Sequence, residues 1–109
     1  MLPCANVIYK GIEMARAWFV PIEGESQEIE VETRFTLRDL SDKYFNGDTL
    51  DFTKGRYLGK VRTMAVSDTG MIDGQPVNIV ATEAYQANGK PGTIWSIHGP
   101  AVIFESILP

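Results

Sequence analysis

The sequence predicts a mainly β fold with one short helix near residues 37–45. The strands are expected to form a small antiparallel barrel, OB-like or SH3-like, or a compact sandwich, of about five to seven strands. Three observations support this prediction. Short runs rich in Val, Ile, Thr and Tyr recur along the chain, turn-forming residues separate these runs, and residues 27–36 alternate between apolar and charged side chains.

The bulk composition is that of one globular domain. The chain has 109 residues, of which 44% are hydrophobic and 22% charged, so residues 1–109 are predicted to form a single domain. Residues 1–25 are a candidate peripheral or oligomerisation segment. The apolar runs are far shorter than the roughly 20 residues of a membrane-spanning helix, and no secretory signal is recognisable at the start. We therefore expect a cytoplasmic protein that does not contact a membrane.

The first quarter of the chain is predicted to be extended. Residues 6–9 and 17–20 have the composition of strands. Between them, residues 12–16 are expected to continue an extended chain past Gly11, with a helical turn as the alternative. A turn is expected at residues 24–26.

The clearest pattern in the chain lies at residues 27–36. Apolar or small side chains alternate there with charged ones, and a period of two places one set in the core and the other in water. The acidic side chains of Glu28, Glu30 and Glu32 are expected on the wet face. They either protect a strand edge from aggregation or form a charged docking surface for a partner.

The predicted helix has start and stop signals. Thr36 and Asp39 fit a helix start, in which the Thr oxygen accepts a backbone N–H. Leu40 and Tyr44 then follow at helical spacing. Asn46-Gly47 supplies the left-handed residues that commonly end a helix.

The second half is predicted to be a meander of antiparallel strands joined by turns. The dipeptide Asp73-Gly74 is of the type that supplies the positive φ angles required by a tight hairpin. The expected strands are residues 50–52, 56–66, 77–86, 93–98 and 101–108, and the expected turns are residues 53–55, 67–74, 88–92 and 99–100.

The sequence contains no motif for metal or phosphate chemistry. His98 is the only histidine and Cys4 the only cysteine, whereas zinc requires three or four ligands. No P-loop and no Gly-x-Gly-x-x-Gly motif is present. We therefore expect neither a metal nor a cofactor, and Cys4 is expected to be an ordinary apolar side chain.

Two places in the sequence offer a route to acid–base chemistry. Ser96 and His98 lie two apart on a predicted strand and so share a face, with Glu105 as a conceivable third member of a triad. No strained elbow motif surrounds Ser96, which favours a structural role for His98. Glu83 would serve as an acid near neutral pH if it were buried in the apolar run around it.

Basic and aromatic side chains gather around the predicted strand at residues 56–66. If this strand is unbroken, Arg56, Lys60 and Arg62 share one face, and exposed aromatic rings beside such a face could stack nucleic acid bases. The alternative is that the aromatic rings, Trp18 included, fill the core while the basic residues pair with the acidic face. The candidate binding residues are Arg56, Tyr57, Lys60, Arg62, Tyr85 and Trp95.

Three functions remain open from the sequence. The first is a non-catalytic binding or assembly module that acts on a protein partner, or on itself as a homo-oligomer, through a sheet face or edge; accessory proteins of phages and mobile elements are an analogy. The second is an OB-like binder of single-stranded nucleic acid, although ten basic against fourteen acidic residues argue against duplex binding. The third is a small β-barrel enzyme that uses His98 or a buried carboxylate.

Overall fold

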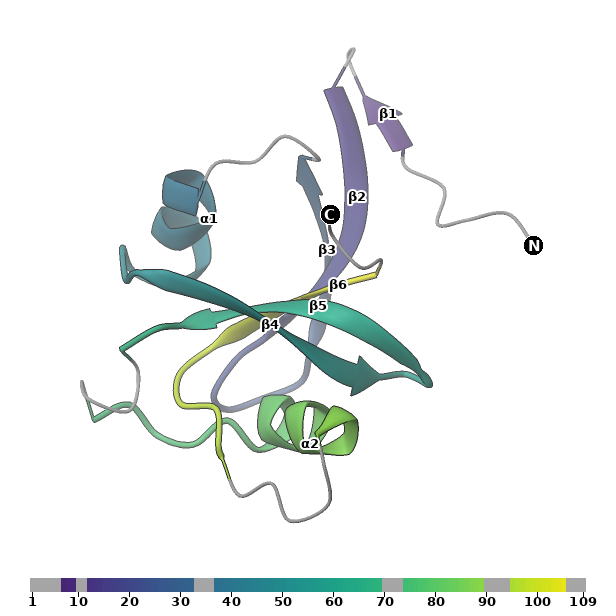
Figure 1. Cartoon of the computed structure of the whole chain (residues 1–109). Coiled ribbons are helices and arrows are strands. Elements are labelled where there is room, and N and C mark those ends of the chain that lie inside the picture. Colours follow the sequence, from purple (N-terminus) through teal and green to yellow (C-terminus); the bar gives the residue numbers. More distant parts are fainter. Residues whose placement is uncertain (1–6, 10–11, 33–36, 70–73, 90–94, 106–109) are drawn as a thin grey trace.

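A computed structural model of the chain describes residues 7–9, 12–32, 37–69, 74–89 and 95–105. These residues form six strands and two helices (Figure 1). In chain order the elements are β1 (Val7–Tyr9), β2 (Ile12–Val20), β3 (Gln27–Glu32), α1 (Leu37–Tyr44), β4 (Leu50–Tyr57), β5 (Lys60–Ser67), α2 (Ile79–Asn88) and β6 (Ala101–Phe104). The predicted mainly β class and the predicted helix near residues 37–45 are confirmed.

All six strands belong to one antiparallel sheet, and its main order is β3-β2-β6-β5-β4. Both β1 and β3 pair with Met14, so they lie on opposite edges of β2. β1 therefore shares an edge of β2 with β6 and extends the sheet beyond the body of the molecule (Figure 1). Within the described residues β3 and β4 are not paired, so the sheet is open and is not a closed barrel.

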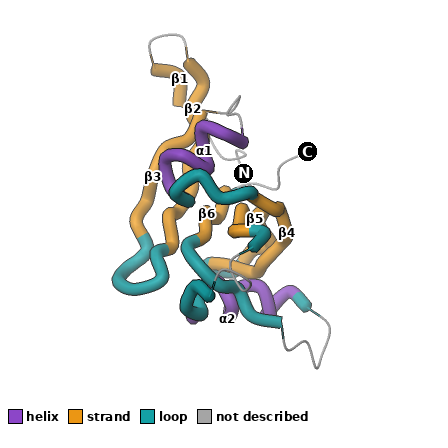
Figure 2. The backbone as a smooth tube through the Cα atoms, turned by 90° about the vertical axis from the view of Figure 1, so that its left-hand side faces the viewer, coloured by secondary structure: helices purple, strands orange, loops and turns teal. Residues whose placement is uncertain are grey.

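The two helices cover opposite faces of the sheet (Figure 2). Successive residues of a strand point to opposite sides, so the central strands supply two separate cores. On the face covered by α1, called the α1 face, the core contains Ala17, Val31, Leu40, Phe45, Ala65, Val102 and Phe104. On the α2 face it contains Val20, Met64, Val66, Ala81, Ala84, Ile97, Ala101 and Ile103.

The N-terminal predictions agree with the structure. The extended conformation expected over residues 12–16 is confirmed by β2, which supplies Ala17 and Val20 to the two cores. The alternation at residues 27–32 is confirmed by β3, while residues 33–36 lie outside the described part of the chain. The oligomerisation role of residues 1–25 stays a prediction.

The strand predicted at residues 77–86 is wrong, because this segment forms α2. Asn78 caps the helix through its side-chain oxygen, which accepts the backbone N–H of Ala81 at 3.1 Å. Ala81 and Ala84 then let the helix lie close on the sheet. The strand predicted at residues 93–98 is also wrong in its described part, where His98 forms only an isolated bridge with Val77.

The unbroken strand predicted at residues 56–66 is a hairpin instead. β4 ends at Tyr57 and β5 begins at Lys60, and the two turn residues, Leu58 and Gly59, have φ angles of 50° and 82°. The turn predicted at residues 53–55 is wrong, since these residues lie within β4.

The last predicted strand is shorter than expected. β6 ends at Phe104, and residues 106–108 lie outside the described part of the chain. The same holds for Cys4 and for most of the turns predicted at residues 67–74 and 88–92.

Candidate functional site

The hairpin divides the predicted basic residues between the two faces of the sheet. Arg56 pairs with Val61, and Tyr57 pairs with Lys60. Directly paired residues point to the same side, so Arg56 lies on the α1 face while Lys60 and Arg62 lie on the α2 face. The single basic face, which required an unbroken strand, does not form.

Arg62 is buried rather than displayed, with an exposed fraction of 6%. Its guanidinium lies 4.8 Å from the centre of the Trp18 ring. Its Nε donates to the carbonyl of Tyr57 and its Nη1 to the carbonyl of Glu105, each at 2.7 Å. The edge of the Tyr57 ring also meets Trp18, with 5.5 Å between ring centres. Arg62 thus ties the hairpin to the end of β6 and occupies a face of Trp18.

The acidic residues of β3 are exposed, as the alternation predicts. Glu28 forms an ion pair with Arg16, in which Glu28 Oε1 lies 2.7 Å from Arg16 Nε. Among the described residues, the partner of the acidic face is therefore Arg16 of β2 rather than any of the candidate binding residues.

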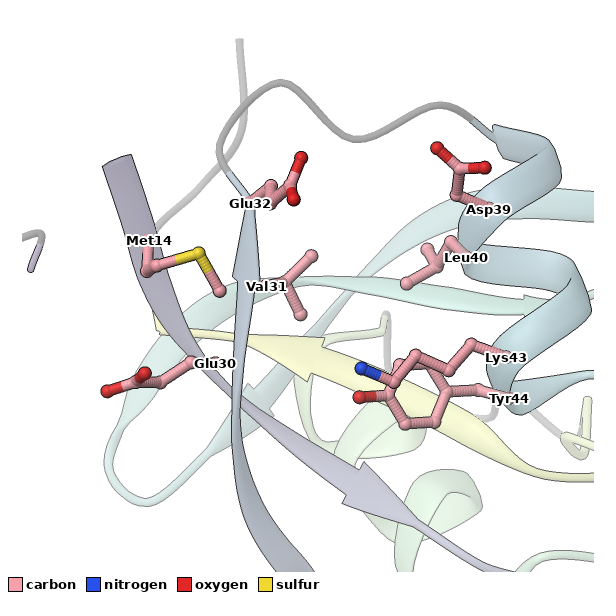
Figure 3. Close-up of a pocket in the computed structure, with 8 residues that line it drawn as sticks. All are labelled: Met14, Glu30, Val31, Glu32, Asp39, Leu40, Lys43 and Tyr44. Atoms are coloured by element: carbon pink, nitrogen blue, oxygen red, sulfur yellow. The ribbon is translucent and has the colours of Figure 1, made fainter. Parts of the chain in front are cut away.

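A pocket of about 210 Å³ lies between β3 and α1 (Figure 3). Val31 and Leu40 face each other across it, and the carboxylates of Glu32 and Asp39 lie at its rim (Figure 3). The charge at this rim is mixed, because Lys43 also lines the pocket.

A larger pocket, of about 380 Å³, lies beside the start of β4, the end of β5 and residues 95–98. We call it the β4–β5 pocket. Its lining includes Tyr85 and Trp95, both candidate binding residues, and the carboxylates of Asp51 and Asp68. This volume is within the range of small-molecule sites. The structure therefore brings Tyr85 and Trp95 together in one pocket, whose lining does not include the other four candidate residues.

Ser96 and His98 line the same pocket and contact each other. His98 Nε2 lies 2.9 Å from Ser96 Oγ, and His98 Nδ1 lies 2.8 Å from the backbone carbonyl of Gln75. A carbonyl can only accept a hydrogen bond, so the neutral ring carries its hydrogen on Nδ1 and Nε2 accepts from Ser96. The third position of the imagined triad belongs to Gln75, because Glu105 pairs with Arg16 instead.

The buried carboxylate suggested at Glu83 is wrong. α2 directs Ala81 and Ala84 toward the core, with exposed fractions of 0% and 4%, and this orientation leaves Glu83 in solvent. Burial cannot therefore prepare Glu83 for acid–base chemistry in the isolated chain.

The outer face of α2 is the feature that the sequence analysis missed. Ile79 and Val80 are 67% and 38% exposed, and Val77 just before the helix is 42% exposed. Trp95, 65% exposed, lies toward the other end of the helix, where its carbonyl accepts a hydrogen bond from Gln86 Nε2 at 3.1 Å. We call Val77, Ile79, Val80 and Trp95 the α2 apolar surface. The sequence did contain a signal for this helix. Asn78 is a residue that favours a helix start, and Ala81 and Ala84 follow it three residues apart, which places them on one side of a helix.

The described residues contain no cluster of three or more His, Cys, Asp or Glu side chains placed to hold a metal ion. In the same part of the chain, neither helix has the length and hydropathy needed to cross a membrane. No protein-family model, curated protein or solved structure matches the chain.

Proposed function

We propose that this chain is a protein-binding module that docks a partner on the α2 apolar surface. The observation that carries the proposal is the inverted burial of α2. Ala81 and Ala84 face the core, while Ile79 is 67% exposed and Val80 38% exposed. α2 thus presents two large apolar side chains to solvent at its start, and neighbouring exposed apolar side chains commonly mark an interaction site.

The composition of this surface suits a protein partner. Trp95 is a large, exposed ring, and tryptophan is among the residues that contribute most to binding energy at protein interfaces. The apolar residues Val77 and Ile79 lie toward the other end of a helix of 10 residues, which is about 15 Å long. The two ends together can hold one amphipathic segment of a partner.

The position of Glu83 favours a different protein over a second copy. Glu83 is exposed at the middle of α2, which spans Ile79–Asn88. If two copies packed α2 against α2 about a twofold axis, each Glu83 would lie near its own symmetry mate. Two like charges in an apolar interface are unfavourable. A partner with apolar side chains and a central lysine or arginine instead complements this surface.

A photoreactive amino acid at position 80 tests the proposal in cells that express the chain. We expect one defined crosslinked partner, and no such product when the photoreactive residue replaces Lys54, which is exposed on β4. The purified partner should then bind the Ile79→Ala/Val80→Ala variant at least tenfold more weakly in a calorimetric titration. Unchanged affinity would contradict the proposal. Crosslinking to a second copy would show self-association instead.

Binding of single-stranded nucleic acid is a second candidate function. It has less support, because Arg56 and Lys60 lie on opposite faces of the sheet and Arg62 is buried. Trp18 and Trp95 allow a direct test, in which an oligonucleotide is titrated at low and high salt while tryptophan fluorescence is measured. We expect no salt-dependent quenching. Quenching at low salt that disappears in the Lys60→Ala variant would favour this second function.

A further inference from the structure

We propose that Ser96 and His98 form a nucleophile–base pair that accepts an acyl group from small neutral or cationic esters bound in the β4–β5 pocket. This proposal does not require partner docking on α2, although Trp95 belongs to both sites. It rests on three residues joined in a row: Ser96 Oγ lies 2.9 Å from His98 Nε2, and the Gln75 carbonyl oxygen lies 2.8 Å from His98 Nδ1.

The roles follow from what each atom can donate. Since the Gln75 carbonyl holds the hydrogen of the neutral ring on Nδ1, the lone pair of Nε2 faces the Ser96 hydroxyl. A hydroxyl next to a base that a third group orients is the general signature of an activated nucleophile. Here the orienting group is a backbone carbonyl, so the alignment needs no further carboxylate.

The surrounding backbone fixes this alignment. The segment at Gln75 is joined to the segment at His98 by a bridge between Val77 and His98. The N–H of Gly99 also donates to the carbonyl of Pro76 at 3.0 Å. On the other side, the N–H of Ile97 donates to Thr82 Oγ1 at 2.9 Å, which attaches the segment that carries Ser96 to α2.

The pocket lining selects the class of ester. Tyr85, Trp95 and Ile97 provide apolar contact for an acyl chain or an aromatic leaving group. Asp51 and Asp68 are exposed carboxylates on the same lining. They repel anionic substrates and favour neutral or cationic ones. A volume of about 380 Å³ suits a small ester.

The chemical step balances with an ester and water. Ser96 Oγ attacks the carbonyl carbon while its proton passes to His98 Nε2. The carbon–oxygen bond to the leaving group then breaks, and the leaving oxygen takes the proton from Nε2. Water attacks the acylated Ser96 with His98 again accepting the proton, which releases the acid and restores the serine.

The test uses p-nitrophenyl acetate and a fluorophosphonate probe on the full chain. We expect a burst of p-nitrophenol, and mass spectrometry should locate one phosphonyl group on Ser96. Ser96→Ala should abolish both signals. Ser26→Ala is the control that should keep both signals, because Ser26 lies between β2 and β3 and does not line this pocket. Ser67 does line the pocket, so Ser67→Ala shows whether that hydroxyl is labelled instead.

The His98→Asn variant distinguishes a role of His98 as a base from a purely structural role. The asparagine amide can still donate to the Gln75 carbonyl, but it no longer presents a base to Ser96. We expect the acylation rate to fall by at least roughly 100-fold with little change in melting temperature. If the melting temperature falls sharply, labelling of Ser96 in the wild type and in the Ser26→Ala control, and its loss in Ser96→Ala, decide whether Ser96 is the nucleophile.

Three results would overturn the proposal. They are the absence of a burst and of Ser96 labelling in the wild type, unchanged Ser96 labelling in a folded His98→Asn variant, and labelling that disappears with Ser67→Ala. A rate for the anionic p-nitrophenyl succinate equal to that for the acetate would contradict the assigned substrate class.

Discussion

Asn78 makes more connections than its neighbours. It is 1% exposed, and its Nδ2 donates to the carbonyls of Val20 and Gly99, each at 3.0 Å. Its Oδ1 accepts from the N–H of Ala81. One side chain therefore joins β2, the approach to β6 and the start of α2. A buried amide with all these partners contributes strongly to the free energy of unfolding, because its removal leaves the partner atoms buried without hydrogen bonds.

Asn78→Ala should lower the free energy of unfolding by about 2–4 kcal/mol, since it removes both the helix cap and two carbonyl contacts. Urea denaturation followed by circular dichroism measures this loss. Asn88→Ala, at the exposed last position of α2, is the control and should change stability little. Equal effects at both positions would show that the hydrogen bonds of Asn78 are unimportant.

Gly55 is a second residue with a large effect on packing, because the absence of a Cβ atom there leaves room for α2. A Cβ there would lie 2.2 Å from Met64 Sδ and 3.1 Å from the backbone of Ala84. The absence of a side chain is what lets α2 approach β4. Gly55→Ala should therefore cost about 1–3 kcal/mol of stability, as measured by thermal unfolding. Lys54→Ala, one residue away and exposed, should be nearly neutral, and similar melting temperatures for the two variants would refute the close approach.

At the scale of elements, the sequence predicts the helices and strands whose local sequence signals agree with the structure that tertiary packing imposes on them. The sequence around α1 carries a start signal, helical spacing and a stop signal, and β3 has a strict alternation. α2 was missed because Val, Ile, Thr and Tyr favour strands, whereas its stability comes from Ala81 and Ala84 packed on a distant sheet. The hairpin at Leu58-Gly59 was missed because leucine is rare at a positive φ.

Replacing Leu58 should therefore stabilise the hairpin. Leu58 has a φ of 50° and is 64% exposed, so it bears conformational strain without compensating burial. Leu58→Asn should raise the free energy of unfolding by about 0.5–1 kcal/mol, because asparagine tolerates the left-handed region. Leu58→Ala keeps the strain and should give no gain. If both variants are destabilised in chemical denaturation, Leu58 makes a contact that outweighs its strain.

At the scale of the whole molecule, the candidate sites depend on pairings between distant segments. The Ser96–His98 contact could be predicted because it is local, but Gln75 lies 23 residues from His98 and reaches it only through the fold. The distribution of the basic residues depended in the same way on the hairpin register. β6, the last strand in the chain, lies between β2 and β5 with all four residues buried, so it completes both cores.

Replacing each of two isoleucines with alanine distinguishes a residue of the core from a residue of the proposed docking surface. Ile103 in β6 is 0% exposed, whereas Ile79 on α2 is 67% exposed. Ile103→Ala should cost about 2–5 kcal/mol, since it leaves a cavity beneath α2, and Ile79→Ala should change stability by less than about 0.5 kcal/mol in the isolated chain. Partner binding should show the reverse sensitivity. If Ile79→Ala alone destabilises the isolated chain as much as Ile103→Ala does, the outer face of α2 is already covered, and the proposed docking surface does not exist.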